Sequence, residues 1–416
     1  LMSGLHAVLL ARGLATAGLI YAAAGPVTAF FRIEEARWAF EAIAVVPLLK
    51  GLMHLDTRRR QRHLDNRPFM ICETAPQILA LLAAWPVLAV SGSYAAAVWI
   101  AVVQSATALA ASHMLARCPY RIAVTKEILL RVVKFGWPIW LSAFPLIAVY
   151  YVDRAIVGRM FGMETLAGYS AAFMLTMVPA TIAGRAAHAL MLPLLVEVRE
   201  FKGLFRKRYG VMAEIYIIAA AVYSAVAIIA GDTLIQLAFG TRYAGLGWVI
   251  SWLGVMWALR MVQAVPGMSL LSMGRTKPLL YAGLVRASAL VVAVAAAVGG
   301  FGVEGVAAAG VLGEIASIVY VAFASQGRRK SDPRGMTWLF LTRSAFLFPV
   351  FAFSGLIALL MPSGLQSVVV LPVAAVTAVI VTFAGLALFP GARGLAEMGW
   401  QAVAGDRTGR DGKAPA

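Results

Sequence analysis

Charged residues are scarce in this chain of 416 residues. Asp, Glu, Lys and Arg make up 13% of the sequence, whereas hydrophobic residues make up 61%. A soluble domain of this length needs a polar outer shell, which this composition cannot supply. Apolar runs of about 20 residues recur, each long enough to cross the bilayer core as a helix. The alternation of apolar and polar residues that is typical of a membrane β-barrel is absent. The sequence therefore predicts an all-α polytopic membrane protein.

The sequence also lacks the signatures of a cofactor or metal enzyme. Its two cysteines, Cys72 and Cys118, provide neither a disulfide framework nor a metal-ligand spacing. The five histidines are scattered along the chain, and we expect no metal cluster. No Walker A, G-x-S-x-G or H-E-x-x-H motif occurs, and no pair of carboxylates has catalytic spacing. We expect no cofactor, no metal and no enzymatic activity.

One apparent nucleotide motif has a simpler explanation. The stretch GFGVEG, Gly300–Gly305, satisfies G-x-G-x-x-G. It lies between two apolar spans with no strand before it, which excludes a dinucleotide site. Gly305, Ala309 and Gly313 recur every four residues, a spacing that lets a neighbouring membrane helix approach closely.

Twelve apolar runs are candidate membrane spans. They cover residues 7–31, 37–54, 70–91, 95–116, 136–153, 166–193, 211–231, 246–272, 279–299, 303–325, 339–361 and 367–389. Every second connection is rich in Lys and Arg: residues 55–67, 117–134, 202–208, 275–277, 328–334 and 393–413. Positively charged loops face the cytoplasm, so both termini are predicted there. The net charge of +17 is explained by these loops, and no nucleic-acid partner is expected.

Charges inside the spans are the candidate functional residues. A charge at mid-bilayer costs roughly 2.5–3.5 kcal/mol, so each one needs a reason. The candidates for a polar central cavity are Arg185, His188, Arg260, Gln263 and Glu314, with Arg12, Gln77 and Gln104 as weaker ones. Arginines in a cavity favour a phosphate-bearing substrate, because guanidinium binds phosphate through a planar fork of donors. Alternatively, a buried arginine pairs with a carboxylate such as Glu314 and only holds helices together. Residues near predicted helix ends are assigned structural roles: Lys50, Glu73, Glu214, Arg286 and Arg343.

Two stretches resemble a known family. KFGWPIWLSAF (Lys134–Phe144) and YVDRAIVGRMFGMETLAGYSAAF (Tyr151–Phe173) are similar to the seventh and eighth helices of bacterial polysaccharide flippases. These are Wzx-type proteins of the MATE-like multidrug/oligosaccharidyl-lipid/polysaccharide exporter superfamily. The matching positions are Asp153, Arg154, Gly158, Gly162, Leu166, Gly168, Tyr169 and Ala172. FGTRYAGLGWVI and LLSMGRTKPLL resemble a later segment of the family, and the resemblance runs from about Leu9 to Ser325.

The resemblance implies a two-lobed helical fold with a cationic cavity that holds the diphosphate and sugars of a polyprenyl-linked oligosaccharide. Alternating access would move this head group across the bacterial inner membrane for exopolysaccharide, capsule or O-antigen (lipopolysaccharide) synthesis. The expected partners are this lipid-linked oligosaccharide, membrane lipids, and polysaccharide polymerase and chain-length proteins. Asp153, Arg154, Gly158, Gly162, Gly168 and Tyr169 would have a gating or structural role, with Gly158 and Gly162 permitting the turn into the next helix.

The same resemblance divides the chain into regions. An N-terminal lobe covers residues 1–116, a cytoplasmic linker 117–135, and a C-terminal lobe of six spans 136–325. A cytoplasmic loop at 326–338, two additional spans at 339–389 and a basic disordered tail at 390–416 follow. Four spans precede the lobe junction where the family has six, and the chain starts with Leu1. We therefore expect that the first two helices of the family are missing.

Other functions stay open. A MATE-like drug exporter would favour acidic residues in the cavity, whereas Arg and Gln predominate here. A major-facilitator transporter carries D-R-x-G-R in a cytoplasmic loop, but here the spacing is D-R-A-I-V-G-R and the charge pattern puts it outside. A membrane glycosyltransferase or polysaccharide polymerase needs a large outer loop or acidic catalytic residues, whereas every predicted outer loop here is short. A non-transporting scaffold is favoured only if one lobe is incomplete.

Overall fold

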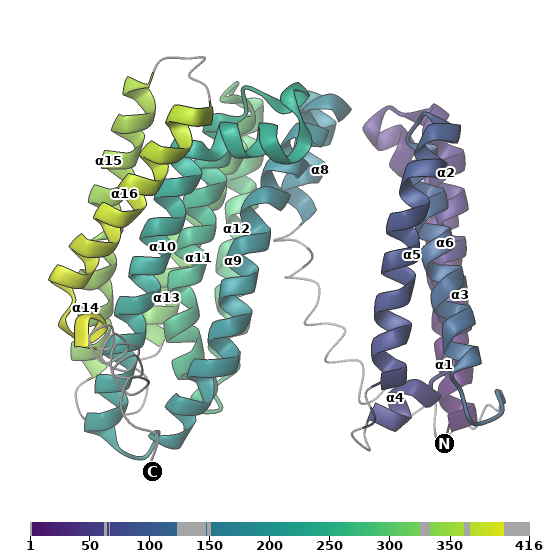
Figure 1. Cartoon of the computed structure of the whole chain (residues 1–416), viewed down its shortest axis with the longest axis horizontal. Helices are drawn as coiled ribbons and strands as arrows, with labels where there is room; N and C mark the ends of the chain where they lie inside the picture. Colours follow the sequence, from purple (N-terminus) through teal and green to yellow (C-terminus); the bar gives the residue numbers. More distant parts are fainter. Residues whose placement is uncertain are drawn as a thin grey trace, which may run out of the picture. The chain divides into compact units, whose positions relative to one another are not determined.

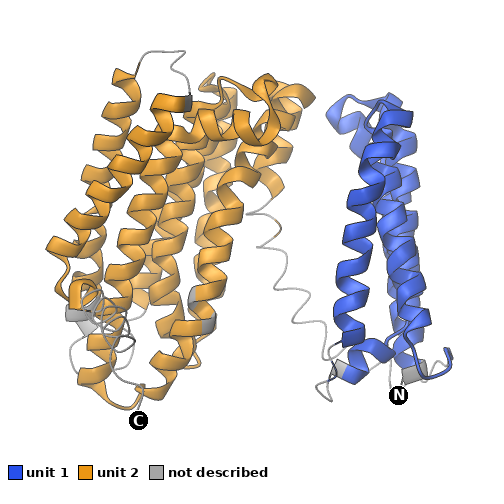
Figure 2. Cartoon of the chain, viewed as in Figure 1, with its two compact units in different colours: residues 1–141 blue, residues 142–416 orange. Residues whose placement is uncertain are grey.

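The computed structural model describes residues 2–61, 65, 67–122, 147, 151–324, 333–361 and 367–394. These residues form helices and contain no β-strand. The chain divides into two compact units, residues 1–141 and residues 142–416, coloured blue and orange in Figure 2.

Unit 1 is built from long helices that stand side by side (Figure 1). Its elements are α1 (Met2–Phe31), η1 (Glu34–Ala36), α2 (Arg37–Ile43), α3 (Val45–Gly51), α4 (Asp56–Gln61), α5 (Arg67–Ser91) and α6 (Ala95–Met114). Helix α1 packs closely on α3, because neither Gly13 nor Gly51 has a side chain at their crossing. Helix α5 packs along α6.

Unit 2 is a larger helical bundle. Its elements are α8 (Asp153–Phe161), α9 (Met163–Glu197), α10 (Lys202–Phe239), η3 (Thr241–Tyr243), α11 (Gly247–Ser272), α12 (Lys277–Val298), α13 (Gly302–Ala324), α14 (Pro333–Ser344), α15 (Leu347–Leu360) and α16 (Ser367–Leu388). Helix α11 packs against α9, α10 and α13, and α10 also packs against α15 and α16 (Figure 1). The largest fully buried side chains of the core belong to this unit, among them Trp257, Tyr169 and Phe173.

Ten helices in the described residues are long and apolar enough to cross a membrane. They agree with ten of the twelve predicted spans, and the protein is a multi-pass membrane protein. The predicted span 37–54 instead forms two short helices, α2 and α3, which are separated at Ala44. Pro47 explains the break, because it has no N–H to donate and its ring crowds the preceding turn. The predicted span 136–153 and the motif at Lys134–Phe144 lie almost wholly outside the described residues.

The small-residue pattern on α13 is confirmed as a packing surface. A Cβ atom on Gly313 would lie 2.7 Å from Cβ of Ala289, and one on Gly305 would lie 3.2 Å from Cβ of Ala296. Both alanines are on α12, and Ala309 between the two glycines is buried. Glycine therefore lets α12 and α13 approach closely along this stripe.

A buried ion pair ties the last helices to α10. Glu214 is 1% exposed, and its Oε1 atom lies 2.7 Å from Nη1 of Arg343 on α14. Its Oε2 atom accepts a hydrogen bond of 2.7 Å from the backbone N–H of Ala392. The same Arg343 atom donates to the carbonyl of Gly210 at 3.1 Å. Glu214 and Arg343 therefore have the structural role that the sequence predicts for them.

The close crossing of α10 and α11 depends on Gly254, which lies on α11. A Cβ on Gly254 would lie 2.5 Å from Cβ of Ala227. We expect Gly254→Ala to destabilise the protein by about 1–3 kcal/mol, the usual cost of overpacking. Adding Ala227→Gly should recover most of the thermal stability in detergent, because it removes the atom that clashes. Gly355→Ala is a matched control, since nothing lies within 4 Å of its new Cβ. A double variant as unstable as Gly254→Ala would contradict this packing.

Candidate functional site

A cavity of about 610 Å³ lies in unit 2 between α9, α11 and α12. Its lining carries three arginines, one from each helix: Arg185, Arg260 and Arg286. His188, one turn after Arg185, and Gln263 also line it. No acidic side chain occurs among the described residues that line it. The cavity is therefore positively charged, and it collects four of the residues that the sequence singles out.

A single carboxylate holds two of these arginines in place. Oε1 of Glu314, on α13, lies 2.7 Å from Nε of Arg260 and 2.8 Å from Nε of Arg286. The Glu314 side chain is completely buried, while those of Arg260 and Arg286 are 15% and 18% exposed. The Arg260 guanidinium also lies 4.4 Å from the ring centre of Trp257, a distance that allows a cation–π interaction. The pairing of Arg260 with Glu314, one of the two alternatives that the sequence leaves open, is thus present, and Arg260 also lines the cavity.

A chain of hydrogen bonds holds the residues next to these ion pairs in place. The side-chain oxygen of Gln263 accepts from Arg286, and its Nε2 donates to Oγ of Ser317 at 2.6 Å. Ser317 in turn donates to the carbonyl of Ala282 at 3.0 Å. Because each group has a partner of the right polarity, Gln263 has one orientation of its amide. The network joins α11, α12 and α13 and orients Arg286 toward Glu314.

The ion-pair cluster leaves an excess of positive charge. Arg260 and Arg286 share the single negative charge of Glu314, so the three groups together carry one positive charge. Arg185, on α9, adds a second positive charge. Its side chain is exposed and forms no salt bridge within the described part of the chain. A site with this excess of positive charge attracts an anion, and guanidinium groups bind phosphate through charge-assisted hydrogen bonds.

The stretch around Asp153 lies next to this cluster. Asp153, Tyr169, Arg260, Arg286 and Glu314 line one small pocket. Asp153 accepts a hydrogen bond of 3.0 Å from the Tyr169 hydroxyl and one of 2.8 Å from the backbone N–H that follows it. The start of α8 is thereby fixed to α9 beside the buried ion pairs.

The residues that follow Asp153 also contact the next helix. The Arg154 guanidinium lies 4.2 Å from the ring centre of Phe173 on α9. Gly162 makes the turn between α8 and α9 with a φ of +89°, a conformation that favours glycine. Gly158 does not contribute to the turn, because it is a buried residue inside α8. Gly168 faces Leu246, and a Cβ there would lie 3.2 Å from its Cδ1.

Three predicted cavity residues belong to unit 1. Arg12 on α1 and Gln77 on α5 are exposed, and Gln104 on α6 is half-buried. They are not among the residues that line the cavity of unit 2. Their role in a central cavity stays a prediction.

Sequence reasoning missed two groups of residues. The sequence predicts a place near a helix end for Arg286, yet it is the tenth residue of α12 and lines the cavity. His6, His54 and His113 are far apart in the sequence but lie together at one end of unit 1. No group of three or more possible metal ligands occurs among the described residues. Three of the histidines that are scattered in the sequence nevertheless cluster.

Residues 2–247 match the sequence model of a family described as polysaccharide biosynthesis protein. This match spans more than half of the chain. The chain belongs to the polysaccharide biosynthesis protein family.

One solved structure has a similar fold. A chain described as the lipid II flippase MurJ, in an inward closed conformation, is similar with a TM-score of 0.69. The two share 11% sequence identity, and the similarity covers 93% of this chain and 83% of that chain. No curated protein sequence matches this one. At this identity the likeness shows the fold alone: the chain has the fold of a solved flippase.

Proposed function

We propose that this protein is a flippase that moves a polyprenyl-diphosphate-linked oligosaccharide across the bacterial inner membrane. The observation that carries the proposal is the cationic cavity of unit 2, where three arginines face a space of about 610 Å³ and the adjacent carboxylate is already paired twice. A diphosphate is the anion best suited to several guanidinium groups, because each offers a fork of donors. The family and fold support a lipid-linked substrate.

The cavity lowers the barrier that a charged head group meets in the bilayer. Moving an isolated anion into hydrocarbon is very unfavourable, and paired cations offset that cost. Arg185, Arg260 and Arg286 would neutralise the diphosphate while the polyprenyl chain stays in lipid. Alternating access would then carry the head group from one face to the other, with Asp153 and Arg154 acting at a gate. Both termini would lie in the cytoplasm, and exopolysaccharide, capsule or O-antigen synthesis would consume the product, with polysaccharide polymerase and chain-length proteins as partners.

The drug-exporter alternative is less well supported. A site for organic cations needs an available carboxylate. Two described acids lie beside the arginines of the cluster. Glu314 is occupied by both arginines, and Asp153 accepts hydrogen bonds from the Tyr169 hydroxyl and from the backbone N–H that follows it. The cavity therefore favours anions over cations.

The arginines of the cavity provide the test. Arg185→Ala or Arg260→Ala should reduce export of surface polysaccharide by about tenfold or more, because each removes charge-assisted hydrogen bonds to the phosphates. Export would be measured in a strain that depends on this protein, together with its abundance in the membrane. Arg185→Ala is the cleaner variant, since Arg185 forms no salt bridge with the other described residues. Arg242→Ala, on the exposed η3 turn, is the matched control and should export normally. Normal export by both cavity variants would refute the assignment.

A further inference from the structure

Three histidines form a cluster at one end of unit 1 that the proposed transport function does not use. The ring centres of His6 and His54 are 4.8 Å apart, and those of His54 and His113 are 5.5 Å apart. The Tyr120 ring lies 4.4 Å from that of His6 and within 5.6 Å of the other two. His6 and His54 are buried, with 1% and 3% of their surface exposed, whereas His113 is exposed.

The backbone partners of His6 and His54 fix their protonation state. Nδ1 of His6 lies 3.1 Å from the carbonyl oxygen of Arg121, so this nitrogen must carry the hydrogen. Nε2 of His6 accepts from the backbone N–H of Leu55 at 3.2 Å, so it carries none. Nδ1 of His54 likewise accepts from the backbone N–H of Asp56 at 3.0 Å. A nitrogen that accepts from an N–H has no proton of its own, so both rings are neutral in this structure.

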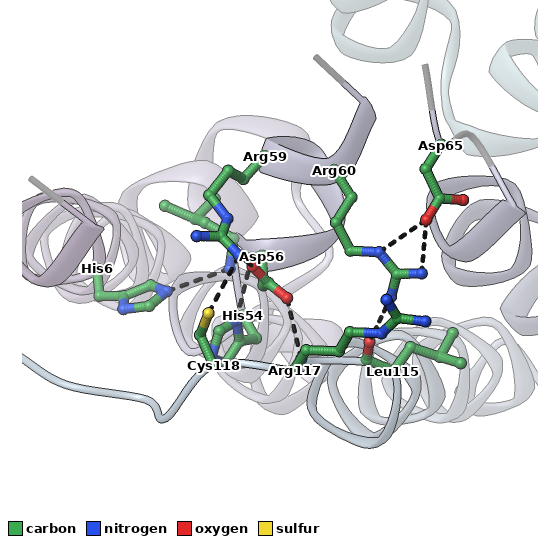
Figure 3. A network of polar contacts seen from close by, with 10 residues as sticks. His6, His54, Asp56, Arg59, Arg60, Asp65, Leu115, Arg117 and Cys118 are labelled. Carbon is green, nitrogen blue, oxygen red and sulfur yellow. Dashed lines mark hydrogen bonds and ion pairs between the residues drawn. The ribbon is translucent and has the colours of Figure 1, made fainter. Parts of the chain in front are cut away.

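The cluster lies against residues 115–121, which we call the clasp segment: the Tyr120 ring contacts the histidines, and the carbonyl of Arg121 faces His6. Figure 3 shows the polar contacts of Leu115, Arg117 and Cys118 in this segment. Besides the bond from His6, Arg60 donates to the carbonyl of Leu115 at 3.2 Å, and Arg59 donates to Sγ of Cys118 at 3.1 Å. The clasp segment therefore bonds to α1 and α4, and its Tyr120 packs against all three histidines. The chain that connects unit 1 to unit 2 continues from this segment.

Asp56 is the acidic centre of the same network (Figure 3). Its carboxylate is fully buried, accepts the backbone N–H of Arg117 at 2.9 Å, and pairs with Arg59 at 2.8 Å. Burial raises the pKa of Asp56, but the hydrogen bond from Arg117 and the charge of Arg59 outweigh burial, so the pKa lies below its usual value. Asp56 thus stays charged in mildly acidic solution.

We propose that the cluster is a proton-sensitive clasp, in which neutral His6 and His54 hold the clasp segment on unit 1 and their protonation releases it. A proton on Nε2 of His6 would point at the backbone N–H of Leu55, and one on Nδ1 of His54 would point at that of Asp56, so each would break the bond that the nitrogen now accepts. These bonds hold the rings and Asp56 in place, and the clasp segment rests on both, through Tyr120 against the rings and the N–H of Arg117 on Asp56. Protonation would also place charge on two rings in contact. The groups that face the rings are His113 on α6, Asp56 with Arg59 on α4, and Tyr120 in the clasp segment. Among the described residues, Asp56 is the acid that faces His54, and it is already paired with Arg59.

The direction of the pH dependence follows from His54. Burial lowers the pKa of His54, and the neighbouring His6 lowers it further; a contact with the backbone of Cys118 acts in the opposite direction, but the net effect is a lowered pKa. The unfolded or released state, with a pKa of about 6.5, then binds protons more readily than the clasped state. The clasp is fully stable above that value and weakens as the pH falls through it. This inference does not depend on the transported substrate.

The natural Cys118 reports on the clasp. In the full-length protein with Cys72→Ser, the reaction of Cys118 with N-ethylmaleimide would be measured at pH 7.5 and 5.5. Each rate is divided by that of the same protein unfolded in detergent at that pH, which removes the pH dependence of the thiolate. The normalised rate should rise about three- to tenfold at pH 5.5, the factor that corresponds to the net loss of one hydrogen bond.

Glutamine variants distinguish the contribution of His6 and His54 from that of His113. His6→Gln/His54→Gln keeps an acceptor at both positions but cannot titrate, so its normalised rate should be the same at both pH values. His113→Gln should keep the wild-type rise, because Nε2 of His113 faces the carbonyl of Leu52 at 3.0 Å and a protonated ring can still donate to it. A flat wild-type rate, or a rise that persists in the double variant, would overturn the proposal. Rapid labelling of the double variant at both pH values, with the wild-type rise intact, would support it by showing that the two imidazoles hold the segment.

Discussion

Replacing Glu314 with alanine is expected to destabilise unit 2 by about 3–5 kcal/mol, the usual cost of removing one partner from a buried ion pair. The carboxylate is fully buried and contacts Arg260 at 2.7 Å and Arg286 at 2.8 Å. Without it, two guanidinium groups of like charge remain between α11, α12 and α13. The midpoint of thermal unfolding in detergent should fall on the order of 10 °C, since each kcal/mol is worth about 2–4 °C in a domain of this size.

Two further variants make this expectation specific. Glu304→Ala changes the same side chain on the same helix at an exposed position, and should shift the midpoint by only a degree or two. Glu314→Gln keeps an acceptor for both arginines but removes the negative charge. Its unfolding midpoint should therefore lie between those of Glu314→Ala and Glu304→Ala. If Glu314→Ala were as stable as Glu304→Ala, the ion pairs would contribute nothing to holding the helices, and the cluster would have to be explained by function alone.

Much of this site could be predicted from the sequence, because a charge in an apolar run is conspicuous. Arg260, Gln263 and Glu314 stand in spans that are otherwise apolar, and the cost of burying them indicates that they have partners. Arg286 was missed through its assignment to a helix end. It lies nine residues after Lys277, the first residue of α12, which at about 1.5 Å per residue is about 14 Å along the axis. From that depth the side chain cannot reach the membrane–water interface. Counting residues from the start of the helix could therefore have identified Arg286 as a charge inside the span.

The pairing of distant residues could not be predicted in the same way. The partners of Glu214 are Arg343 and the backbone of Ala392, which no spacing rule relates to it. The histidine cluster likewise joins α1, the turn before α4 and the end of α6. Helix length and apolar content predict ten of the spans, since they depend on local sequence alone. Which ends of those helices meet is decided by tertiary packing, and a single sequence carries little information about it.

Gly13→Ala should disrupt the contact between α1 and α3. The new Cβ would lie 2.8 Å from Cα of Gly51 and 2.8 Å from the carbonyl oxygen of Pro47. Both are backbone atoms, so no rotamer change relieves the clash, and the two helices must move apart. We expect a loss of about 3 kcal/mol, at the upper end of the usual cost of overpacking. Thermal unfolding in detergent, followed by circular dichroism, would measure it.

Gly18→Ala is the matched control on the same helix, because nothing lies within 4 Å of its new Cβ. It should be neutral or stabilising by up to about 1 kcal/mol, since alanine favours helix more than glycine does. The two variants also test how unit 1 is connected. His6 is on α1, and its partner Leu55 follows α3. Separating the two helices should therefore weaken the bond between these residues, and Cys118 should be labelled faster at pH 7.5 in Gly13→Ala but not in Gly18→Ala. Equal stability of the two variants would mean that α1 and α3 do not approach as closely as the structure has them. Equal labelling with unequal stability would mean that the clasp segment is held independently of this helix pair.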